Sequence, residues 1–165
     1  MSVIKLYRHP LSGHSHRVEL LLSVLGLNAE IIDIDLMKGE QKSTEFLAKN
    51  PNGQVPAIED NGIFYTDSNA ILVYLATKYD LERSWLPTDA IDASDIQKYL
   101  TIAAGAVAYG PAAARLVTLF GAGLDHDNAI NTATNLFEKL NGHLENRDWL
   151  ATNHPTIADI ANYAY

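Results

Sequence analysis

The chain has 165 residues, of which 47% are hydrophobic and 19% are charged, and its formal net charge at pH 7 is −8. This composition is typical of a globular protein with room for one large domain or two small ones. Its basic residues are scattered singly, so no basic stripe predicts a nucleic-acid partner. Cysteine is absent, which excludes disulfides, thiolate metal ligands and a redox cycle on the protein's own sulfur.

The chain begins with MSVIKLYRHP, in which no basic segment leads into a long apolar stretch. We also expect no window to approach the roughly 20 apolar residues of a membrane helix. The sequence therefore predicts a cytoplasmic protein with no membrane partner.

The first part of the chain predicts a strand, a helix and a second strand. The run VIKLY at 3–7 is short and partly alternating, which is typical of a strand. Residues 18–25 place apolar side chains on one helical face, and Gly26 follows where a helix commonly ends. The run AEIIDID at 29–35 predicts the second strand. A right-handed crossover through the helix should make the two strands parallel.

Local signals then predict a helix, a hairpin and another helix. Ser43 can cap a short helix that must end near Pro51. Asn61-Gly62 lies between two apolar runs, which predicts a two-residue hairpin turn. Asp67 precedes a further amphipathic segment. The resulting order, β-α-β-α-β-β-α, predicts a mixed sheet with helices on its faces.

The rest of the chain predicts helices only. We expect an α/β domain over residues 1–80, a linker over 81–92 that contains Pro87, and an all-helical domain over 93–165. The first of the helices should run from about residue 94 to 120 and should be kinked or broken at Gly110-Pro111.

Two more helices follow. The second helix has an apolar face at Ile130, Ala133, Thr134, Phe137, Leu140 and Leu144. In the third, Thr156 and Asp159 have the spacing of a capping box. The chain stops two turns into this helix. We therefore expect the helical domain to be incomplete, with apolar faces for missing chain or another subunit to cover.

Four features in the same order resemble a cytosolic glutathione S-transferase over the whole chain. They are the β-α-β-α-β-β-α unit, QVP before the third strand, TDSNAI after the fourth, and TIADIA in the helical region. The run LYRHPLSGHSHRVELLLSVLGL is most similar to bacterial branches whose first loop carries a catalytic serine, threonine or cysteine. The resemblance implies a thioredoxin-like N-terminal domain, glutathione as co-substrate, no metal, and a homodimer.

The resemblance also implies a set of glutathione-binding residues. Val55-Pro56 should have a cis peptide bond, so that the Val55 backbone meets the cysteinyl part of glutathione; a trans proline at a strand start is the alternative. Asp67 and Ser68 should hold the γ-glutamyl group at a helix N-terminus, and their alternative role is the N-cap of that helix. Gln41 and Gln54 should bind the glycyl end or the backbone of glutathione, with exposed loop glutamines as the alternative, and Lys42 could bind the same terminal carboxylate.

The loop HPLSGHSHRV carries the predicted chemistry. The resemblance puts Ser12 at the catalytic position, where its hydroxyl would stabilise the glutathione thiolate at the positive end of a helix. Ser15 could cap that helix, and His14 could face the sulfur or the second substrate. A metal site built from His9, His14 and His16 is the weaker alternative, because their spacing is irregular and carboxylates are absent until Glu19.

The second substrate should be a small hydrophobic electrophile. Tyr109 and Arg115 flank Gly110-Pro111 and are candidates to contact it; a core tyrosine and a surface arginine are the alternatives. Conjugation of glutathione is the leading function. Disulfide reduction run between bound glutathiones and a binding module without turnover are the other hypotheses. An isomerase is less favoured, since LSGHSH does not match the serine-serine-cysteine run of that branch.

Overall fold

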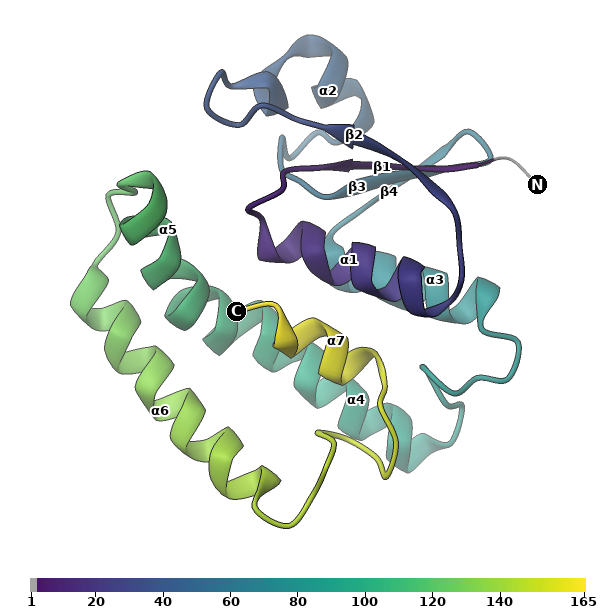
Figure 1. Ribbon diagram of the computed structural model, residues 1–165, viewed down its shortest axis with the longest axis vertical. Helices are drawn as coiled ribbons and strands as arrows, with labels where there is room; N and C mark the ends of the chain where they lie inside the picture. Colours follow the sequence, from purple (N-terminus) through teal and green to yellow (C-terminus); the bar gives the residue numbers. More distant parts are fainter. Residues whose placement is uncertain (1–2) are drawn as a thin grey trace. The chain divides into compact units, whose positions relative to one another are not determined.

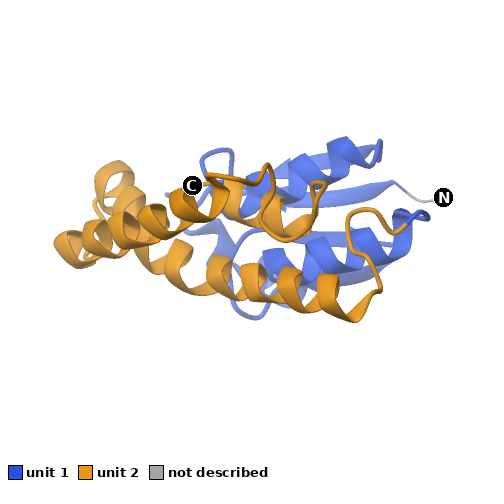
Figure 2. Cartoon of the chain, turned by 90° about the horizontal axis from the view of Figure 1, so that it is seen from below, with its two compact units in different colours: residues 1–82, 164 blue, residues 83–163, 165 orange. Residues whose placement is uncertain are grey.

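The computed structural model describes residues 3–165. The chain divides into two compact units, coloured in Figure 2: residues 1–82 with residue 164, and residues 83–163 with residue 165.

The first unit has the predicted β-α-β-α-β-β-α order, with one added turn of 3₁₀-helix, η1 (Figure 1). The strands lie in the order β2-β1-β3-β4, and only the β1–β2 pair is parallel, so the predicted mixed sheet is confirmed. The elements are β1 (Ile4–Arg8), α1 (Gly13–Val24), β2 (Ala29–Asp33), η1 (Glu40–Lys42), α2 (Thr44–Lys49), β3 (Ala57–Asp60), β4 (Ile63–Thr66) and α3 (Ser68–Tyr79).

Helices cover both faces of this sheet: α1 and α3 on one face, α2 on the other (Figure 1). Successive side chains of β1 point to opposite faces of the sheet, so this strand contributes to the core on both faces. Tyr7 packs with Phe46 of α2, whereas Leu6 is fully buried on the side of α1 and α3. Burying each large apolar side chain of this kind contributes about 1.5–3 kcal/mol. The largest apolar side chains of this core that are fully buried are Leu6, Val18, Leu21, Ile58, Ile71, Leu72 and Leu75.

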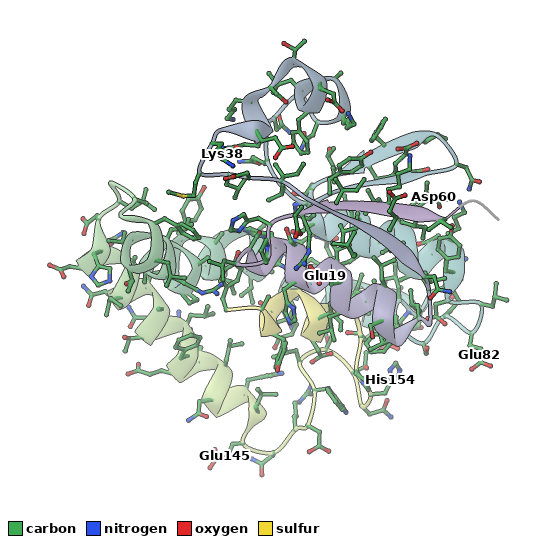
Figure 3. All side chains as sticks on the ribbon, turned by 45° about the horizontal axis from the view of Figure 1, so that its top comes forward. Glu19, Lys38, Asp60, Glu82, Glu145 and His154 are labelled. Carbon is green, nitrogen blue, oxygen red and sulfur yellow. The ribbon has the colours of Figure 1, made fainter. Side chains whose placement is uncertain are left out.

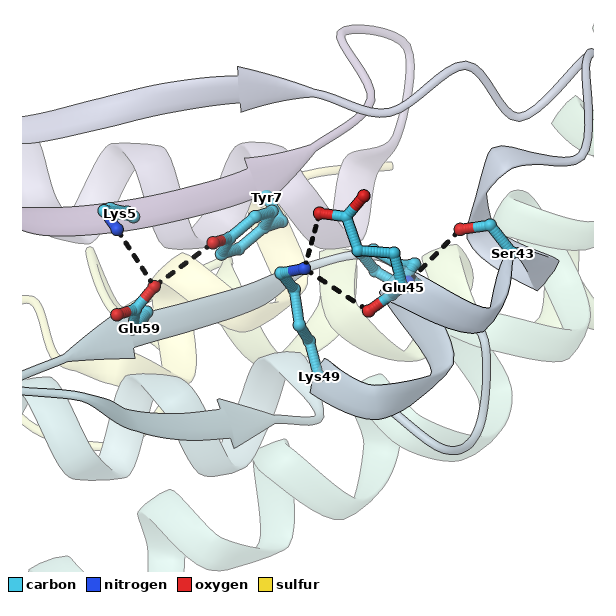
Figure 4. Close-up of polar contacts among 7 residues, drawn as sticks. Lys5, Tyr7, Ser43, Glu45, Lys49 and Glu59 are labelled. Carbon is cyan, nitrogen blue, oxygen red and sulfur yellow. Dashed lines mark hydrogen bonds and ion pairs between the residues drawn. The ribbon is translucent and has the colours of Figure 1, made fainter.

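Polar contacts reinforce the sheet and α2 (Figure 4). Lys5 faces Glu59 across the β1–β3 pair, with 3.2 Å from its Nζ to Glu59 Oε2, and the Tyr7 hydroxyl donates to the same oxygen. The Ser43 hydroxyl accepts a hydrogen bond from the backbone N–H of Phe46 at 3.2 Å. The predicted cap of α2 is therefore confirmed.

The hairpin turn between β3 and β4 is confirmed, since Asn61 and Gly62 have positive φ values of 52° and 79°. A buried cluster joins this hairpin to the C-terminal end of α3. Oδ2 of Asp60, labelled in Figure 3, accepts hydrogen bonds from Tyr74, Lys78 and Tyr79 at 2.7, 2.7 and 2.5 Å.

The second unit is helical. Its first helix begins earlier than predicted, because Asp89 caps it by accepting from the backbone N–H groups of Ile91 and Asp92. The predicted linker thus contains the first turn of this helix. The elements are α4 (Ala90–Ile102), η2 (Ala103–Ala112), α5 (Ala113–Phe120), α6 (His126–Leu144) and α7 (Ile157–Tyr163).

The helix was predicted to be kinked or broken at Gly110-Pro111, and the break was wrong. The helix continues without interruption from Ala90 to Phe120, and its middle section, η2, is π-helical. In an α-helix the proline ring clashes with the carbonyl four residues earlier. The wider turn of a π-helix displaces that carbonyl, so the helix can continue through Pro111.

The expectation about membrane helices also needs correction, because this continuous helix of 31 residues is long and apolar enough to cross a membrane. One such helix is weak support for a membrane span, since a core helix of a globular unit passes the same test. Here α4 packs against α7, and η2 packs against α6.

The predicted apolar face of α6 is largely exposed. Ala133 is buried as expected, but Ile130, Phe137 and Leu144 are exposed, and the buried positions beside Ala133 are Ala129 and Leu136. Close approach explains the choice of small residues: a Cβ added to Gly110 of η2 would lie 2.9 Å from the Ala133 backbone nitrogen.

The predicted capping box of α7 is confirmed. Thr156 Oγ1 accepts from the Ala158 N–H at 3.2 Å, and Asp159 Oδ2 accepts from the Thr156 N–H at 2.8 Å. The other carboxylate oxygen of Asp159 accepts from the Leu150 N–H at 2.9 Å, so this side chain also holds the segment between α6 and α7.

Candidate functional site

The strand register gathers three predicted site segments at one edge of the sheet. Tyr7 of β1 lies opposite Ala57 of β3, which lies opposite Thr66 of β4. The loop after β1, the Val-Pro pair before β3 and the corner after β4 therefore leave the sheet side by side. Residues that are far apart in the sequence meet here because β1 is antiparallel to β3, and β3 to β4.

The loop after β1 is a tight turn that delivers Ser12 to the start of α1. The Ser12 N–H donates to the His9 carbonyl at 2.9 Å, and His9 Nδ1 accepts from the Leu11 N–H at 3.2 Å. Ser12 is the N-cap of α1, and its hydroxyl oxygen accepts from the Ser15 N–H at 3.2 Å. A hydroxyl that accepts one hydrogen bond still has its own proton to donate.

Ser15 does not cap α1, so that alternative was wrong. Its side chain is buried, and its hydroxyl oxygen accepts from the His9 N–H at 3.3 Å. Ser15 therefore stabilises the turn between β1 and α1, whereas Ser12 caps the helix.

His14 connects this loop to α3. Its Nδ1 atom lies 3.2 Å from the Ser68 hydroxyl oxygen. Burial, together with the positive charge of Arg17, lowers the pKa of His14 to about 4, and the negative charge of Asp67 opposes the shift. His14 is consequently neutral at pH 7 and can serve only as a neutral hydrogen-bonding group there.

The three histidines of the loop do not converge. His9 uses Nδ1 within its own turn, His14 uses Nδ1 toward Ser68, and His16 is exposed. Across residues 3–165, no three His, Asp or Glu side chains are placed to share a metal ion. The geometry thus gives the metal hypothesis no support.

The corner between β4 and α3 combines a cap with an unusual backbone. Asp67 has φ 66° and ψ 120°, a conformation that costs a non-glycine residue free energy, and its carboxylate accepts from the Ala70 N–H at 2.9 Å. The N-cap role is confirmed. It uses Asp67 Oδ1 and leaves the exposed side chain able to bind a ligand group as well.

Arg17 contacts the predicted site residue Ser68 and was not among the residues predicted from the sequence. It is 1% exposed, and its Nη1 atom donates to Ser68 Oγ at 3.3 Å and to Asn69 Oδ1 at 2.8 Å. The available signal was its place on the helix: it lies one turn after His14 and next to Val18, at the margin of the apolar face.

The segment before β3 has the geometry that the resemblance implied. The Val55-Pro56 peptide bond is cis. The Gln54 carbonyl accepts from the Asn50 side-chain amide at 2.7 Å, and Asn50 is buried. Asn50, which the sequence analysis also missed, thus anchors the backbone just ahead of Val55.

Gln41 and Lys42 lie against the loop before Gln54. Lys42 Nζ is 3.3 Å from the Asn52 carbonyl oxygen, and a Cβ added to Gly53 would lie 2.8 Å from the Gln41 carbonyl oxygen. Gly53 also has φ 58°, so both conformation and space favour glycine there. The buried Oε1 atom of Gln41 has no hydrogen-bond partner among residues 3–165.

Tyr109 and Arg115 lie on η2 and α5 of the second unit. Tyr109 is 73% exposed, so the alternative of a core tyrosine was wrong. Arg115 is half-buried. A contact with the second substrate stays a prediction for both.

A shallow groove of about 390 Å³ lies elsewhere in the first unit, between α1 and the edge strand β2. Its lining includes Glu19, Leu22, Leu27 and Ile31 and none of the predicted site residues. Its place therefore does not bear on the site at the sheet edge.

Comparison with known proteins gives the same assignment over the whole chain. The family described as the N-terminal domain of glutathione S-transferase matches residues 2–77, and the C-terminal domain of the same family matches residues 121–165. Glutathione S-transferase 3 of Zea mays is 34% identical over 99% of this chain and 77% of its own length. The chain belongs to the glutathione S-transferase family.

Two further relatives support this membership. Glutathione S-transferase 2 of Schizosaccharomyces pombe is 35% identical over 98% of this chain and 73% of its own length. A glutathione transferase homolog from Drosophila mojavensis, solved with bound glutathione, superimposes with a TM-score of 0.90 at 28% identity, covering 99% of this chain and 76% of that one. The thioredoxin-like fold with a helical second part is thus the family fold.

Proposed function

We propose that this glutathione S-transferase ionises bound glutathione and adds its sulfur to a small hydrophobic electrophile, with Ser12 as the thiolate-stabilising donor. The observation that carries the proposal is the strand register, which brings the Ser12 loop beside Val55 and the start of α3. Ser12 lies at the positive end of α1, and its hydroxyl proton is not used by the cap that its oxygen makes. Both features favour a nearby anion.

Glutathione would lie along the sheet edge with its γ-glutamyl end at α3. The N–H groups at the start of α3 and the Ser68 hydroxyl would bind the carboxylate, and Asp67 would bind the ammonium group. The backbone of Val55 would hold the cysteinyl residue, which puts its sulfur toward Ser12.

The glycyl end would reach Gln41, Lys42 and Gln54. The buried side-chain oxygen of Gln41 fits this role, because a buried polar atom gains free energy when a ligand supplies its hydrogen-bond partner. Rotation of the amide by 180° would instead present its NH₂ group to the glycyl carboxylate. The ammonium of Lys42 would add an opposite charge.

Reaction requires the thiol to lose its proton to solvent as glutathione binds. The thiolate then forms a carbon–sulfur bond with the electrophile, which either accepts the sulfur by addition or loses a leaving group with its electron pair. His14 is neutral and contributes hydrogen bonding without charge. Ionisation therefore depends on Ser12 and on the dipole of α1.

Tyr109 and Arg115 are our candidates for contacts with the electrophile. Membership in a bacterial branch with a catalytic serine, threonine or cysteine in the first loop and a homodimer remain predictions from the resemblance. A cytoplasmic location remains a prediction from the sequence.

The experiment is steady-state kinetics of Ser12→Ala with an aryl halide. Loss of one hydrogen bond to an ion should lower kcat/KM by roughly 10- to 100-fold, and Ser12→Thr, which keeps the hydroxyl, should recover part of it. Asp125→Ala, which removes the cap of α6 in the second unit, is the control for the loss of a helix cap. Unchanged kcat/KM in Ser12→Ala would contradict the role of Ser12.

Two further assays separate the alternatives. Faster turnover of hydroxyethyl disulfide than of any aryl halide would favour disulfide reduction. No calorimetric signal with millimolar glutathione would favour a binding module without turnover.

A further inference from the structure

Arg17 is the most deeply buried charged side chain near the site, and its visible role is to join two helices. From α1 it donates to two consecutive residues of α3, Ser68 at 3.3 Å and Asn69 at 2.8 Å. Burying a guanidinium is costly, and an apolar side chain of similar volume would join two helices at lower cost. Its position therefore points to a role in binding.

The bonds of Arg17 constrain Ser68 in a specific way. A guanidinium can only donate, so Ser68 Oγ must accept from Arg17. His14 lies one turn earlier on the same face of α1 and reaches the same oxygen at 3.2 Å. The single hydroxyl proton of Ser68 can therefore go to His14 or to a ligand acceptor at the start of α3.

Asn69 provides the second contact of Arg17 with α3. Its side-chain oxygen accepts the shorter of the two Arg17 bonds. Together the two bonds hold the first turn of α3 directly after Asp67, whose backbone φ is 66°. These two hydrogen bonds hold the first turn of α3 in one conformation. Less conformational entropy is therefore lost when an anion binds to the backbone N–H groups of that turn.

We propose that Arg17 is a positioning residue for the γ-glutamyl end of glutathione, acting through Ser68 and Asn69. It is too deeply buried to be the main ligand contact, with 1% of its surface exposed. Its positive charge behind the N-terminus of α3 strengthens the attraction of that end for a carboxylate. The proposal rests on the proposed function, since it concerns the same substrate at the same sheet edge.

The test compares Arg17→Met with the wild-type enzyme, using glutathione and cysteinylglycine as alternative thiols. Cysteinylglycine keeps the thiol and the glycyl end but lacks the γ-glutamyl group. Arg17→Met should raise KM for glutathione by about 10-fold or more, with kcat changed by less than about threefold, because the lost interaction is made in the ground state and the transition state alike. Its kcat/KM with cysteinylglycine should stay within about threefold of wild type.

Two variants keep the test decisive if Arg17→Met does not fold. Arg17→Lys keeps the charge with one donor group and should show a smaller rise in KM. Asn69→Ala removes the acceptor of the 2.8 Å bond and should raise KM for glutathione in the same direction. In a double-mutant cycle with Ser68→Ala, the effects of Arg17→Lys on KM should be less than additive, because Arg17 acts through Ser68.

The outcomes are distinct. Equal losses with both thiols, or unchanged KM for glutathione in Arg17→Lys and Asn69→Ala, would overturn the positioning role. If wild-type protein failed to bind glutathione at all, the proposed function would fail, and it would do so before any variant was compared.

Discussion

The two ends of α3 are fastened by different chemistry. At the C-terminal end, the Asp60 carboxylate accepts from the Lys78 ammonium and from two tyrosine hydroxyls. At the N-terminal end, Arg17 donates to the Ser68 hydroxyl and the Asn69 amide, and the Asp67 carboxylate accepts from the Ala70 N–H. One end pairs opposite charges within the fold, whereas the other places the buried positive charge of Arg17 behind a helix N-terminus, which is where we propose that the γ-glutamyl carboxylate binds.

The electrostatics of the C-terminal end indicate a purely stabilising role. Burial alone would raise the pKa of Asp60, but hydrogen bonds from Lys78, Tyr79 and Tyr74 outweigh it and hold that pKa below its ordinary value. The same contacts raise the pKa of Lys78. The charged pair is therefore favoured over the whole range around neutral pH. We therefore expect α3 to serve stability at its C-terminal end and, in the proposed function, ligand binding at its N-terminal end.

The largest effect should come from Asp60→Ala. It leaves two half-buried tyrosine hydroxyls without their shared acceptor, whereas water can rehydrate the exposed Lys78 ammonium, so the free energy of unfolding should fall by about 3 kcal/mol. Urea denaturation measures it, and kcat/KM of the fraction that stays folded should change little. A loss of stability below about 1 kcal/mol would show that the Asp60 end does not fasten α3.

His14, which contacts the N-terminal end of α3, should make the free energy of unfolding depend on pH. Its folded pKa of about 4 lies below the ordinary value near 6.5, so in this window the unfolded chain binds a proton that the folded chain does not. The free energy of unfolding should therefore decrease as pH falls from about 6.5 to 4, by about 2–3 kcal/mol from this group. His14→Gln should flatten that slope. Parallel pH profiles of the variant and wild type would contradict the burial of a neutral His14.

A moderate effect is expected from Asp159→Ala, where a helix cap serves stability alone. The variant loses the capping box of α7 and the bond from the Leu150 N–H, so the free energy of unfolding should fall by about 1–2 kcal/mol. Thermal unfolding checks it. Retention of full stability would mean that the box does not hold α7.

The smallest effect should come from Lys49→Met. Lys49 pairs with Glu45 one helical turn away at 2.9 Å, and the Glu45 side chain is 87% exposed (Figure 4). Because water competes for the exposed carboxylate, a pair of this kind contributes little to stability, and the urea denaturation midpoint of Lys49→Met should stay close to that of wild type. A clear loss of stability in Lys49→Met would show that this surface pair stabilises the fold as strongly as the contacts at the ends of α3.

Local chemistry made much of the first unit predictable. Ser43 and Asp67 cap helices as their sequence contexts indicate, and Asn61-Gly62 forms the hairpin turn, because each depends on neighbours within a few residues. The element order follows from these signals, and the order then limits the sheet to a few topologies.

Two of the misses depend on distant neighbours. Arg17 gains its meaning only when α1 packs on α3, 51 residues away at Ser68. The buried face of α6 follows from the close approach of Gly110 to Ala133 rather than from the larger side chains around it. At Pro111, a change of helix type replaced the predicted break. Periodicity within one segment carries no information about such partners.

The central claim is that Ser12 lowers the pKa of the thiol of bound glutathione. The most direct test is an ultraviolet titration of thiolate in the binary complex, with wild-type, Ser12→Ala and His14→Ala proteins side by side. The account predicts that Ser12→Ala raises the pKa of the bound thiol by about one to two units, whereas His14→Ala changes it by much less. Loss of the thiolate signal in His14→Ala, with Ser12→Ala unchanged, would contradict it.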